Sequence, residues 1–202
     1  MKIIFATGNQ GKLREVRAIV ADLGIEVESM KDAGIDVDIV EDGKTFAENA
    51  LIKARTVCKA CGEVTMSDDS GLEIDALDGA PGVHTARYAG DDKDPAANRR
   101  LVLQELAGLP FEKRSARFRC VVALIEDGNL SVFEGTCEGH IALQESEGVQ
   151  GFGYDSIFVP IGLDVTLAEI SIEEKNRLSH RGKAMRMLQC HLLQSRGSSS
   201  SI

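Results

Sequence analysis

The chain has 202 residues, and its 23 lysines and arginines against 32 aspartates and glutamates give a formal net charge of -9. Apolar residues make up 43% of the sequence, aromatic residues only 4%, and tryptophan is absent. This length and composition predict one globular domain, or two closely joined lobes. The acidic balance argues against a protein that binds duplex DNA or a membrane surface, because such proteins carry a basic patch. It also makes a small anionic substrate an unexpected ligand.

The sequence carries no clear targeting or disulfide signal. The apolar run at residues 2–6 is shorter than the roughly 7–15 residues of a signal-peptide core, and no stretch reaches the roughly 18 apolar residues of a membrane-spanning helix. The five cysteines are odd in number and scattered, unlike the disulfide framework of a secreted protein. Cys58 and Cys61 have the spacing of a redox or zinc motif, but no second ligand pair accompanies them. We interpret both as half-buried helix residues and expect a cytoplasmic protein.

Hydrophobic spacing and turn residues predict a chain in which strands and helices alternate. In chain order, the expected elements are a strand at 2–6, a helix at 13–23, a helix at 45–62, strands at 64–66 and 72–76, a helix at 95–106, strands at 115–126 and 130–141, a strand at 156–159 and helices after Ser171. Asp127 and Gly128, between the two longest strands, are typical of a β-hairpin turn. This order indicates an α/β protein with a mixed sheet. Residues 1–195 form the predicted domain, and residues 196–202 are a low-complexity tail.

A polar turn between the first strand and the first helix is the first candidate site. Its sequence is Thr7-Gly8-Asn9-Gln10-Gly11-Lys12. The segment is not a P-loop, because its glycines are too close together and Leu13 stands where a hydroxyl residue is required. A glycine turn before a helix still offers an anion backbone N–H groups and a favourable helix dipole. An ordinary strand-to-helix turn explains the same residues, so both interpretations stay open.

The adjacent carboxylates Asp68 and Asp69, followed by Ser70, form the second candidate site. Like charges repel, and a purely structural turn more often uses a single acid. We interpret the pair as a candidate Mg²⁺ site, because hard divalent cations take carboxylate oxygens and keep several waters. A metal-bound or carboxylate-activated water would then be the nucleophile. Glu41, in the acidic stretch upstream, is a further candidate ligand, although a solvated loop carboxylate also explains it.

Two later segments carry candidate nucleotide contacts. Gly151-Phe152-Gly153-Tyr154-Asp155 is not the dinucleotide fingerprint, because Ser156 stands at the third glycine position. Glycines around two aromatic rings suit a loop on which a flat base stacks, and a β-bulge with two core aromatics is the alternative. Lys175 and the run Ser179-His180-Arg181 can donate to phosphates or base carbonyls. A basic cluster at a helix end is the alternative for these residues.

Taken together, these segments resemble the non-canonical purine nucleoside triphosphate pyrophosphatases, the dITP/XTP (ITPase-like) family. The matching motifs follow the family's order over residues 1–195: Thr7-Gly8-Asn9-x-x-Lys12, Glu41 before Thr45–Asn49, Asp68-Asp69-Ser70-Gly71-Leu72, Gly79-Ala80-Pro81-Gly82, Thr85-Ala86-Arg87-Tyr88, Gly151-Phe152-Gly153-Tyr154-Asp155, Glu174-Lys175 and Ser179-His180-Arg181. The chain departs from the family pattern at Ser67, usually Ala, at Val149-Gln150, usually Thr-Gly, and at Ser156, usually Pro. None of these departures removes a charged or catalytic group.

The resemblance implies an elongated α/β fold of the Maf/ITPase type, in which a long twisted mixed sheet with flanking helices forms two lobes around a central cleft. It also implies a homodimer that hydrolyses ITP, dITP and XTP to the monophosphate and pyrophosphate with Mg²⁺, and so removes deaminated purines from the nucleotide pool. By position, Asp69 is the implied general base and a Mg²⁺ ligand, and Glu41 is the second ligand. The implied substrate contacts are Thr7, Gly8, Asn9, Gln10, Gly11, Lys12, Ser70, Phe152, Gly153, Tyr154, Asp155, Lys175, His180 and Arg181.

For the reaction, we expect a water activated by Asp69 to attack the α-phosphorus and expel pyrophosphate, with Lys12 and Lys53 stabilising the leaving group. Donors from His180, Arg181 and backbone N–H groups would bind the 6-keto oxygen of inosine or xanthine and reject the 6-amino group of adenine by about 10⁴-fold. A non-catalytic nucleotide-binding module is the rival interpretation. A Maf-like pyrophosphatase for modified pyrimidines is a nearer rival, which the complete motif order disfavours.

The distribution of charge reconciles the acidic composition with an anionic substrate. Residues 22–48 hold many of the acids and only the bases Lys31 and Lys44. Lys12, Lys175 and Arg181 stand instead at candidate phosphate and base contacts. The net charge therefore argues against polyanion binding but allows a metal-chelated triphosphate, since the metal is part of the charge of the site.

Overall fold

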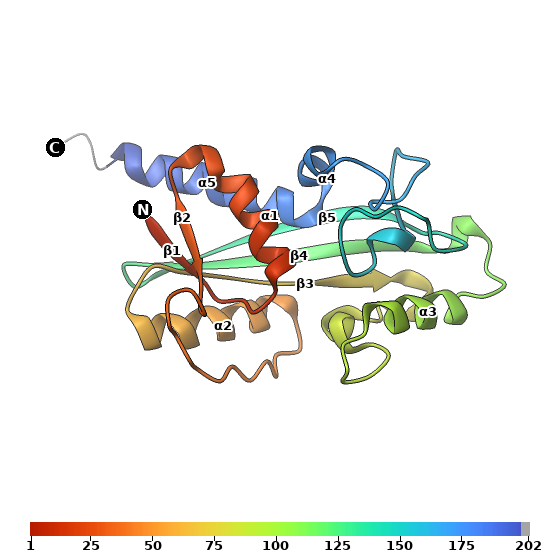
Figure 1. The fold of residues 1–202 in the computed structure, drawn as a ribbon, viewed down its shortest axis with the longest axis horizontal. Coiled ribbons are helices and arrows are strands. Elements are labelled where there is room, and N and C mark those ends of the chain that lie inside the picture. The colour runs from red at the N-terminus through yellow and green to blue at the C-terminus, as the bar shows by residue number, and fades with distance from the viewer. Residues whose placement is uncertain (199–202) are drawn as a thin grey trace. The chain divides into compact units, whose positions relative to one another are not determined.

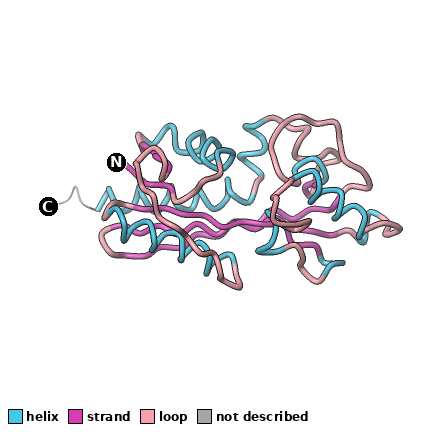
Figure 2. The backbone as a smooth tube through the Cα atoms, turned by 60° about the horizontal axis from the view of Figure 1, so that its bottom comes forward, coloured by secondary structure: helices cyan, strands magenta, loops and turns pink. Residues whose placement is uncertain are grey.

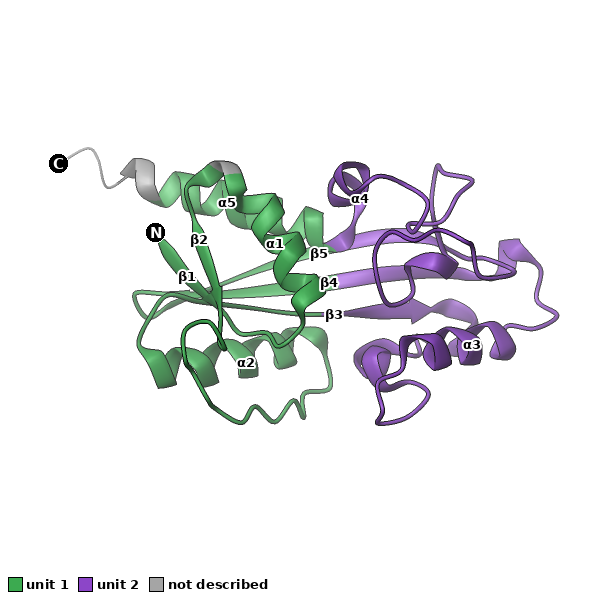
Figure 3. Ribbon diagram, in the orientation of Figure 1, with its two compact units in different colours: residues 1–69, 120–135, 181–202 green, residues 70–119, 136–180 purple. Residues whose placement is uncertain are grey.

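The computed structural model describes residues 1–198 (Figure 1). The chain divides into two compact units (Figure 3): unit 1 holds residues 1–69, 120–135 and those from 181 onward, and unit 2 holds residues 70–119 and 136–180. Residues 196–198 of the predicted tail belong to the last helix, and residues 199–202 lie outside the described residues. The predicted arrangement of two lobes around a cleft stays a prediction.

A six-stranded mixed sheet is the frame of the fold (Figure 2), with the strand order β2-β1-β3-β4-β5-β6. The strands are β1 (Lys2–Phe5), β2 (Glu26–Ser29), β3 (Thr65–Ile74), β4 (Ser115–Glu126), β5 (Asn129–Ile141) and β6 (Phe158–Pro160). β1 pairs in parallel with β2 and with β3, whereas β5 and β6 are antiparallel. The expected α/β class with a mixed sheet is therefore confirmed.

The α-helices of residues 1–198 are α1 (Gln10–Val20), α2 (Phe46–Cys61), α3 (Pro95–Glu105), α4 (Ile172–Leu178) and α5 (His180–Ser198). Within unit 1, α1 and α5 lie on one face of the strands and α2 lies on the other (Figure 1). Among the described residues, no helix is both long and apolar enough to cross a membrane.

The alternation of side chains along β1 builds a core on both faces of the sheet in unit 1. Ile3 and Phe5 point into the cluster that α1, β4 and α5 share, whereas Ile4 and Ala6 point toward α2. Buried residues on both faces explain why this strand is an uninterrupted apolar run. Unit 2 has a separate apolar cluster, formed by parts of β3, β4 and β5 with α3 and β6.

Local signals mark the ends of α2 and the hairpin turn as predicted, whereas the helix predicted at 13–23 begins earlier and ends earlier, as α1 (Gln10–Val20). Thr45 Oγ1 accepts a hydrogen bond from Glu48 N at 3.1 Å and caps α2, which Gly62 ends with a φ of 69°. Asp127 and Gly128 both have positive φ, as a two-residue hairpin turn between β4 and β5 requires. Cys58 and Cys61 are half-buried residues of α2, as predicted.

One strand prediction needs correction. The predicted strands at 64–66 and 72–76 are a single strand, β3, which continues through Ser67, Asp68, Asp69, Ser70 and Gly71. The polar residues and the glycine suggest a turn, but the stretch belongs to a strand that lies between β1 and β4 and is hydrogen-bonded to both. The predicted strand at 156–159 is shifted, since a 3₁₀ turn at Asp155–Ile157 precedes β6.

Candidate active site

Strand β3 directs two adjacent carboxylates to opposite sides of the sheet within unit 1. Asp68 meets Lys12 of α1 and Arg181 of α5, while Asp69 meets residues of α2. This separation follows from the two-residue period of a strand, which turns successive side chains to opposite faces. The two acids therefore lie in different environments although they are neighbours in the sequence.

Asp68 is the fixed anion of a buried ion network. Its side chain is 2% exposed, and its Oδ2 lies 3.1 Å from Lys12 Nζ and 3.2 Å from Arg181 Nε. Arg181 also contacts Glu15 through Nη1. Burial raises the pKa of Asp68, but the charges of Lys12 and Arg181 outweigh it and hold the pKa well below its usual range. Asp68 is therefore ionised at neutral pH and is a poor proton acceptor.

Asp69 has the opposite electrostatic environment. Its Oδ2 accepts a hydrogen bond from Asn49 Nδ2 at 3.1 Å, and its Oδ1 lies 3.3 Å from Lys53 Nζ. Burial raises the pKa of Asp69 above its ordinary value, against the opposing charges of Lys53 and Lys12. Neighbouring acids whose pKa values move apart are typical of a site with divided acid–base roles. Asp69 is the better placed of the two to accept a proton.

Lys53 joins Asp69 to Glu41. Its ammonium group lies 2.5 Å from Glu41 Oε2 and 3.3 Å from Asp69 Oδ1, and the residue is 7% exposed. Burial lowers the pKa of Lys53, but the carboxylates of Asp69, Asp68 and Glu41 together raise it above its ordinary value. The extended segment 35–41 places Glu41 there, because its alternate residues Ile35, Val37 and Ile39 pack on the cluster that α2 shares with β1.

The oxygens of Glu41 and Asp69 converge on the ammonium group of Lys53. Mg²⁺ is usually held by one or two carboxylates together with waters and substrate phosphates, rather than by a full protein cage. Among residues 1–198, no group of three or more histidine, cysteine, aspartate or glutamate side chains that could hold a metal is found. A Mg²⁺ site at Glu41 and Asp69 stays a prediction.

The turn Thr7–Lys12 is a capped helix start. Asn9 Oδ1 accepts hydrogen bonds from Gly11 N at 2.8 Å and from Lys12 N at 3.2 Å, and Thr7 Oγ1 accepts one from Asn9 N. Gly8, Asn9 and Gln10 are exposed. The turn therefore serves as an ordinary strand-to-helix connection in which Asn9 caps α1. The Lys12 side chain points to Asp68.

In unit 2, the predicted base-binding loop is organised around Asp155. This buried carboxylate accepts hydrogen bonds from Phe152 N at 2.7 Å and from Lys175 Nζ at 2.8 Å. Lys175 Nζ also lies 4.9 Å from the centroid of the Phe152 ring. At Gly151, which has a φ of +83°, a Cβ atom would lie 2.2 Å from Asp155 Oδ2. Only glycine fits this close approach.

The two aromatic residues of this loop have different surroundings. Phe152 is 38% exposed, whereas Tyr154 is 3% exposed and belongs to the apolar cluster of unit 2. The Tyr154 hydroxyl donates to Thr85 O at 2.8 Å, and burial raises the pKa of this phenol well above its usual range. Tyr154 is thus a core residue, and Phe152 is the ring that a base can reach.

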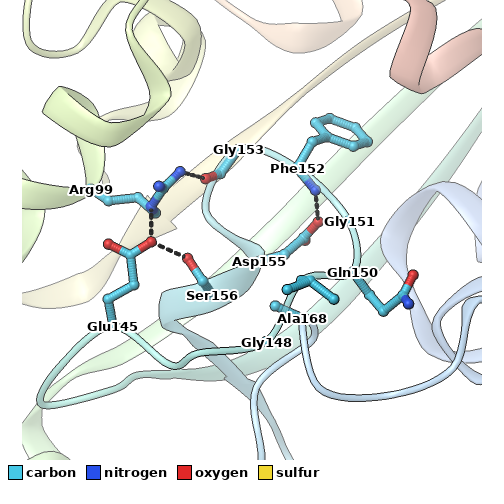
Figure 4. Close-up of a pocket in the computed structure, with 11 residues that line it drawn as sticks. Arg99, Glu145, Gly148, Gln150, Gly151, Phe152, Gly153, Asp155, Ser156 and Ala168 are labelled. Atoms are coloured by element: carbon cyan, nitrogen blue, oxygen red, sulfur yellow. Dashed lines mark hydrogen bonds and ion pairs between the residues drawn. The ribbon is translucent and has the colours of Figure 1, made fainter.

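A polar chain anchors the same loop to α3 and borders a cavity of about 170 Å³ (Figure 4). Arg99 Nη1 donates to Gly153 O at 2.8 Å and its Nε lies 2.6 Å from Glu145 Oε1, which accepts a hydrogen bond from Ser156 Oγ at 2.8 Å. Sequence reasoning missed Arg99 and Glu145, because neither belongs to a motif and they are far apart in the chain.

The remaining predicted residues divide between the units. Ser70 is a half-buried residue of β3 in unit 2. His180 begins α5 and belongs to unit 2, where its ring stacks on Phe118 with centroids 4.8 Å apart, while Arg181 belongs to unit 1. Within unit 1 the structure brings Lys12 and Arg181 to Asp68, and it joins Glu41 to Asp69 through Lys53. Within unit 2 it brings together Phe152, Asp155 and Lys175.

The chain belongs to the Ham1 family, whose sequence model matches residues 3–191. The resemblance drawn from the motifs is thereby confirmed. Among its relatives is the dITP/XTP pyrophosphatase of Bacillus licheniformis, which is 46% identical over 188 residues, or 93% of this chain and 95% of that protein. The dITP/XTP pyrophosphatase of Bacillus subtilis is 47% identical over 186 residues, or 92% and 93% of the two chains.

Solved structures agree with this membership. The Ham1 protein of Staphylococcus aureus has a TM-score of 0.85 and 39% identity, and the match covers 96% of this chain and all (100%) of the other. The nucleoside-triphosphatase / dITP/XTP pyrophosphatase of Mycobacterium abscessus has a TM-score of 0.75 and 44% identity, with 93% and 98% of the two chains covered.

Proposed function

We propose that this protein is a nucleoside-triphosphate pyrophosphatase that hydrolyses ITP, dITP and XTP to the monophosphate and pyrophosphate in the cytoplasm. The observation that carries the proposal is the placement of Asp69, which is hydrogen-bonded to Asn49 and lies 3.3 Å from Lys53, next in the strand to the buried pair of Asp68 and Lys12. Membership of the Ham1 family and the names of the relatives support the choice of substrates.

In the proposed reaction, Asp69 takes a proton from a water molecule. The water oxygen then forms a bond to the α-phosphorus, the bond to the bridging oxygen of the β-phosphate breaks, and pyrophosphate leaves. Lys12 and Lys53 supply positive charge for the phosphate chain, each oriented by a carboxylate. Glu41 and Asp69 would hold Mg²⁺, which supplies Lewis-acid stabilisation of the phosphate charge when bound. Thr7–Gly11 and Ser70 are the proposed further contacts to the triphosphate.

Unit 2 is proposed to recognise the purine. The exposed Phe152 ring offers a stacking surface, and the Asp155–Lys175 pair and the backbone at Gly153 and Tyr154 fix the loop that carries it. Lys175 and His180 are the proposed donors of this unit for the 6-keto oxygen of the base. A pocket of donors favours inosine and xanthine over adenine, because the amine of adenine would leave those donors unpaired.

A pyrophosphate-release assay with ITP, dITP, XTP, GTP and ATP, with and without Mg²⁺, tests the proposal. We expect Mg²⁺-dependent release from the first three. Asp69→Asn should lower kcat by about 10²–10⁴-fold while nucleotide binding persists. Asp32→Asn is the matched control, because Asp32 pairs with Arg17 at the surface of unit 1. Tight nucleotide binding without pyrophosphate release would instead indicate a regulatory module.

The proposed enzyme is a homodimer, the state that the family resemblance implies. Sedimentation analysis of the full chain tests this part separately, and a single species of monomer mass would contradict it.

A further inference from the structure

Asn49, in the first turn of α2, uses both ends of its side-chain amide. The residue is 4% exposed. Its Oδ1 accepts a hydrogen bond from Gly43 N at 2.9 Å, and its Nδ2 donates one to Asp69 Oδ2 at 3.1 Å. All three residues belong to unit 1. Asn49 therefore links the end of the segment that carries Glu41 to the proposed general base.

The partners of Asn49 fix the direction of its amide. The backbone N–H of Gly43 can only donate, and an ionised Asp69 can only accept. A rotation that exchanged the oxygen and nitrogen of the amide would place a donor against a donor and an acceptor against an acceptor. Both hydrogen bonds would be lost inside a buried site, where an unpaired polar group costs about 1–3 kcal/mol. The amide thus has one orientation, with its NH₂ group toward Asp69.

Gly43 permits this contact because it has no side chain. A Cβ atom at position 43 would lie 2.6 Å from Asn49 Oδ1, 2.8 Å from Glu48 Cβ and 2.9 Å from Asn49 N. Two of these contacts involve atoms of the helix start itself, which cannot move without moving α2. Any other residue at position 43 would therefore push this segment away from Asn49.

Asp69 is consequently held at both oxygens by one helix. Asn49 binds Oδ2 and Lys53 lies at Oδ1, and residues four apart share a helix face. Ser67 Oγ donates to Ala50 O at 2.5 Å and attaches β3 to the same turn of α2. Ala50 is the neighbour of Asn49 in α2. The bond from Ser67 therefore fixes β3 against α2 close to the Asp69 carboxylate.

We infer that Asn49 is a positioning residue for the reaction, oriented by Gly43, and that it sets the direction in which the Asp69 carboxylate faces its water. The inference rests on the proposed function, since it takes Asp69 as the base. It adds two residues, Gly43 and Asn49, to the groups on which turnover depends. Neither has to touch the substrate.

Steady-state kinetics of Asn49→Ala, Asn49→Asp and Gly43→Ala with ITP and Mg²⁺ test the inference. A misdirected base slows the chemical step, so we expect kcat to fall by about 10–100-fold while KM stays within about two-fold. Asn49→Asp keeps the shape of the side chain but replaces the donor by an acceptor facing Asp69. Its kcat should be at least as low as that of Asn49→Ala.

Asn98→Ala is the matched control. Asn98 is also a buried asparagine with both amide ends bonded, since it accepts from Ala89 N at 2.6 Å and donates to Ala86 O at 3.1 Å. Asn98→Ala should have a lower melting temperature than the wild type, as Asn49→Ala should, but it should keep the wild-type kcat. Equal losses of kcat in the two variants, or an unchanged kcat in Asn49→Ala, would overturn the inference.

A double-mutant cycle tests the role of Gly43. If Gly43 acts through Asn49, Gly43→Ala adds little to the loss in kcat that Asn49→Ala already causes. Fully additive losses would mean that Gly43 acts independently and would overturn that part of the inference.

A readout without turnover separates this inference from the proposed function. In NMR spectra of the nucleotide-free protein, the carboxamide protons of Asn49 should be protected from exchange, and Asp69→Ala and Gly43→Ala should both remove the protection. Protection that neither variant changes would overturn the inference. If no nucleotide releases pyrophosphate but the protection behaves as expected, the linkage stands and the proposed function fails.

Discussion

Units 1 and 2 each contain a buried arginine, and the two arginines have opposite partners. Arg181 in unit 1 contacts the carboxylates of Asp68 and Glu15, whereas Arg114 in unit 2 donates to the carbonyl oxygens of Leu106, Leu109 and Ala142. Burial lowers the pKa of both, but Asp68 and Glu15 raise that of Arg181 far above its ordinary value.

The difference extends to the two groups of predicted site residues. Unit 1 gathers charged side chains whose pKa values depend on one another, which suits proton transfer and phosphate chemistry. Unit 2 uses its polar side chains mainly to hold backbone, at Gly153 through Arg99 and at Phe152 through Asp155. Such contacts fix the shape of a loop and suit the recognition of a rigid base. Mutations should therefore change catalysis and charge in unit 1, and loop shape in unit 2.

The largest expected effect on stability is that of Asp68→Asn. The substitution leaves Lys12 and Arg181 without their shared carboxylate, and breaking a buried ion pair costs about 3–5 kcal/mol. In the folded protein the pKa of Asp68 lies below 3.8, the value of a free aspartate side chain. The ionised carboxylate therefore stabilises the fold at any pH above 3.8. This contribution is lost as the pH falls below 3.8 toward the pKa of the folded protein. Urea unfolding without divalent metal measures this. The difference in the free energy of unfolding between the variant and the wild type should become smaller at low pH.

Arg114→Met should have the next largest effect. One buried and two partly buried carbonyl groups lose a charged donor, so we expect a loss of about 3 kcal/mol in the free energy of unfolding. Because no carboxylate is left behind, the loss should be nearly independent of pH between 5 and 8, unlike that of Asp68→Asn. Hydrogen exchange should increase around β5 and the end of α3. A pH-dependent loss would contradict the contrast between the two arginines.

Glu145→Ala should have a smaller effect, confined to substrate binding. It frees Arg99 and Ser156 and loosens the loop at 151–156, so kcat/KM for ITP should fall by about 3–10-fold, mainly through KM. Glu147→Ala is the control, since no partner of Glu147 is found among residues 1–198 and it lies on the same exposed segment. An equal loss of kcat/KM in both variants would show that the polar chain of Arg99 and Glu145 does not hold the loop.

The smallest effect concerns the cysteines. Burial raises the pKa of Cys120 to about 12, assisted by the charge of Asp68, whereas Cys190 is exposed. Iodoacetamide at pH 8 should therefore label Cys190 in the folded protein and leave Cys120 unlabelled, without loss of turnover. Mass spectrometry of labelled peptides measures this. Labelling of Cys120 before unfolding would contradict its burial beside Asp68.

Sequence patterns predict the elements of this fold well where one local interaction decides the outcome. Thr45 and Glu48 mark the start of α2, and Asp127 and Gly128 mark the hairpin, because these signals act within a few residues. The pattern at Ser67–Gly71 misleads, since the strands that pair with β3, namely β1 and β4, are distant in the sequence. The charge of a residue is visible in the sequence, but the side of the sheet to which it points is not.

The same limit applies to the candidate site. The sequence singles out Lys12, Asp69 and Arg181, but it does not show that Lys12 and Arg181 share Asp68, or that Asp68 and Asp69 differ in pKa. Arg99 and Asn49 become visible only once the folded chain brings them to Gly153 and Asp69. Long-range hydrogen bonds of this kind leave no periodic signal.

The alternation of side chains along β3 has a consequence for the tolerance of the chain to insertions and deletions. Removing one residue before Asp68 would move Asp69 into the position that faces Lys12 and Arg181 and would place Ser70 beside Asn49. A single-codon deletion would therefore take the carboxylate away from α2 without changing either acid. An insertion at the exposed turn Asp127-Gly128 shifts neither carboxylate. Length changes in this protein should therefore be accepted at the hairpin tip and rejected in the strand that carries the acids.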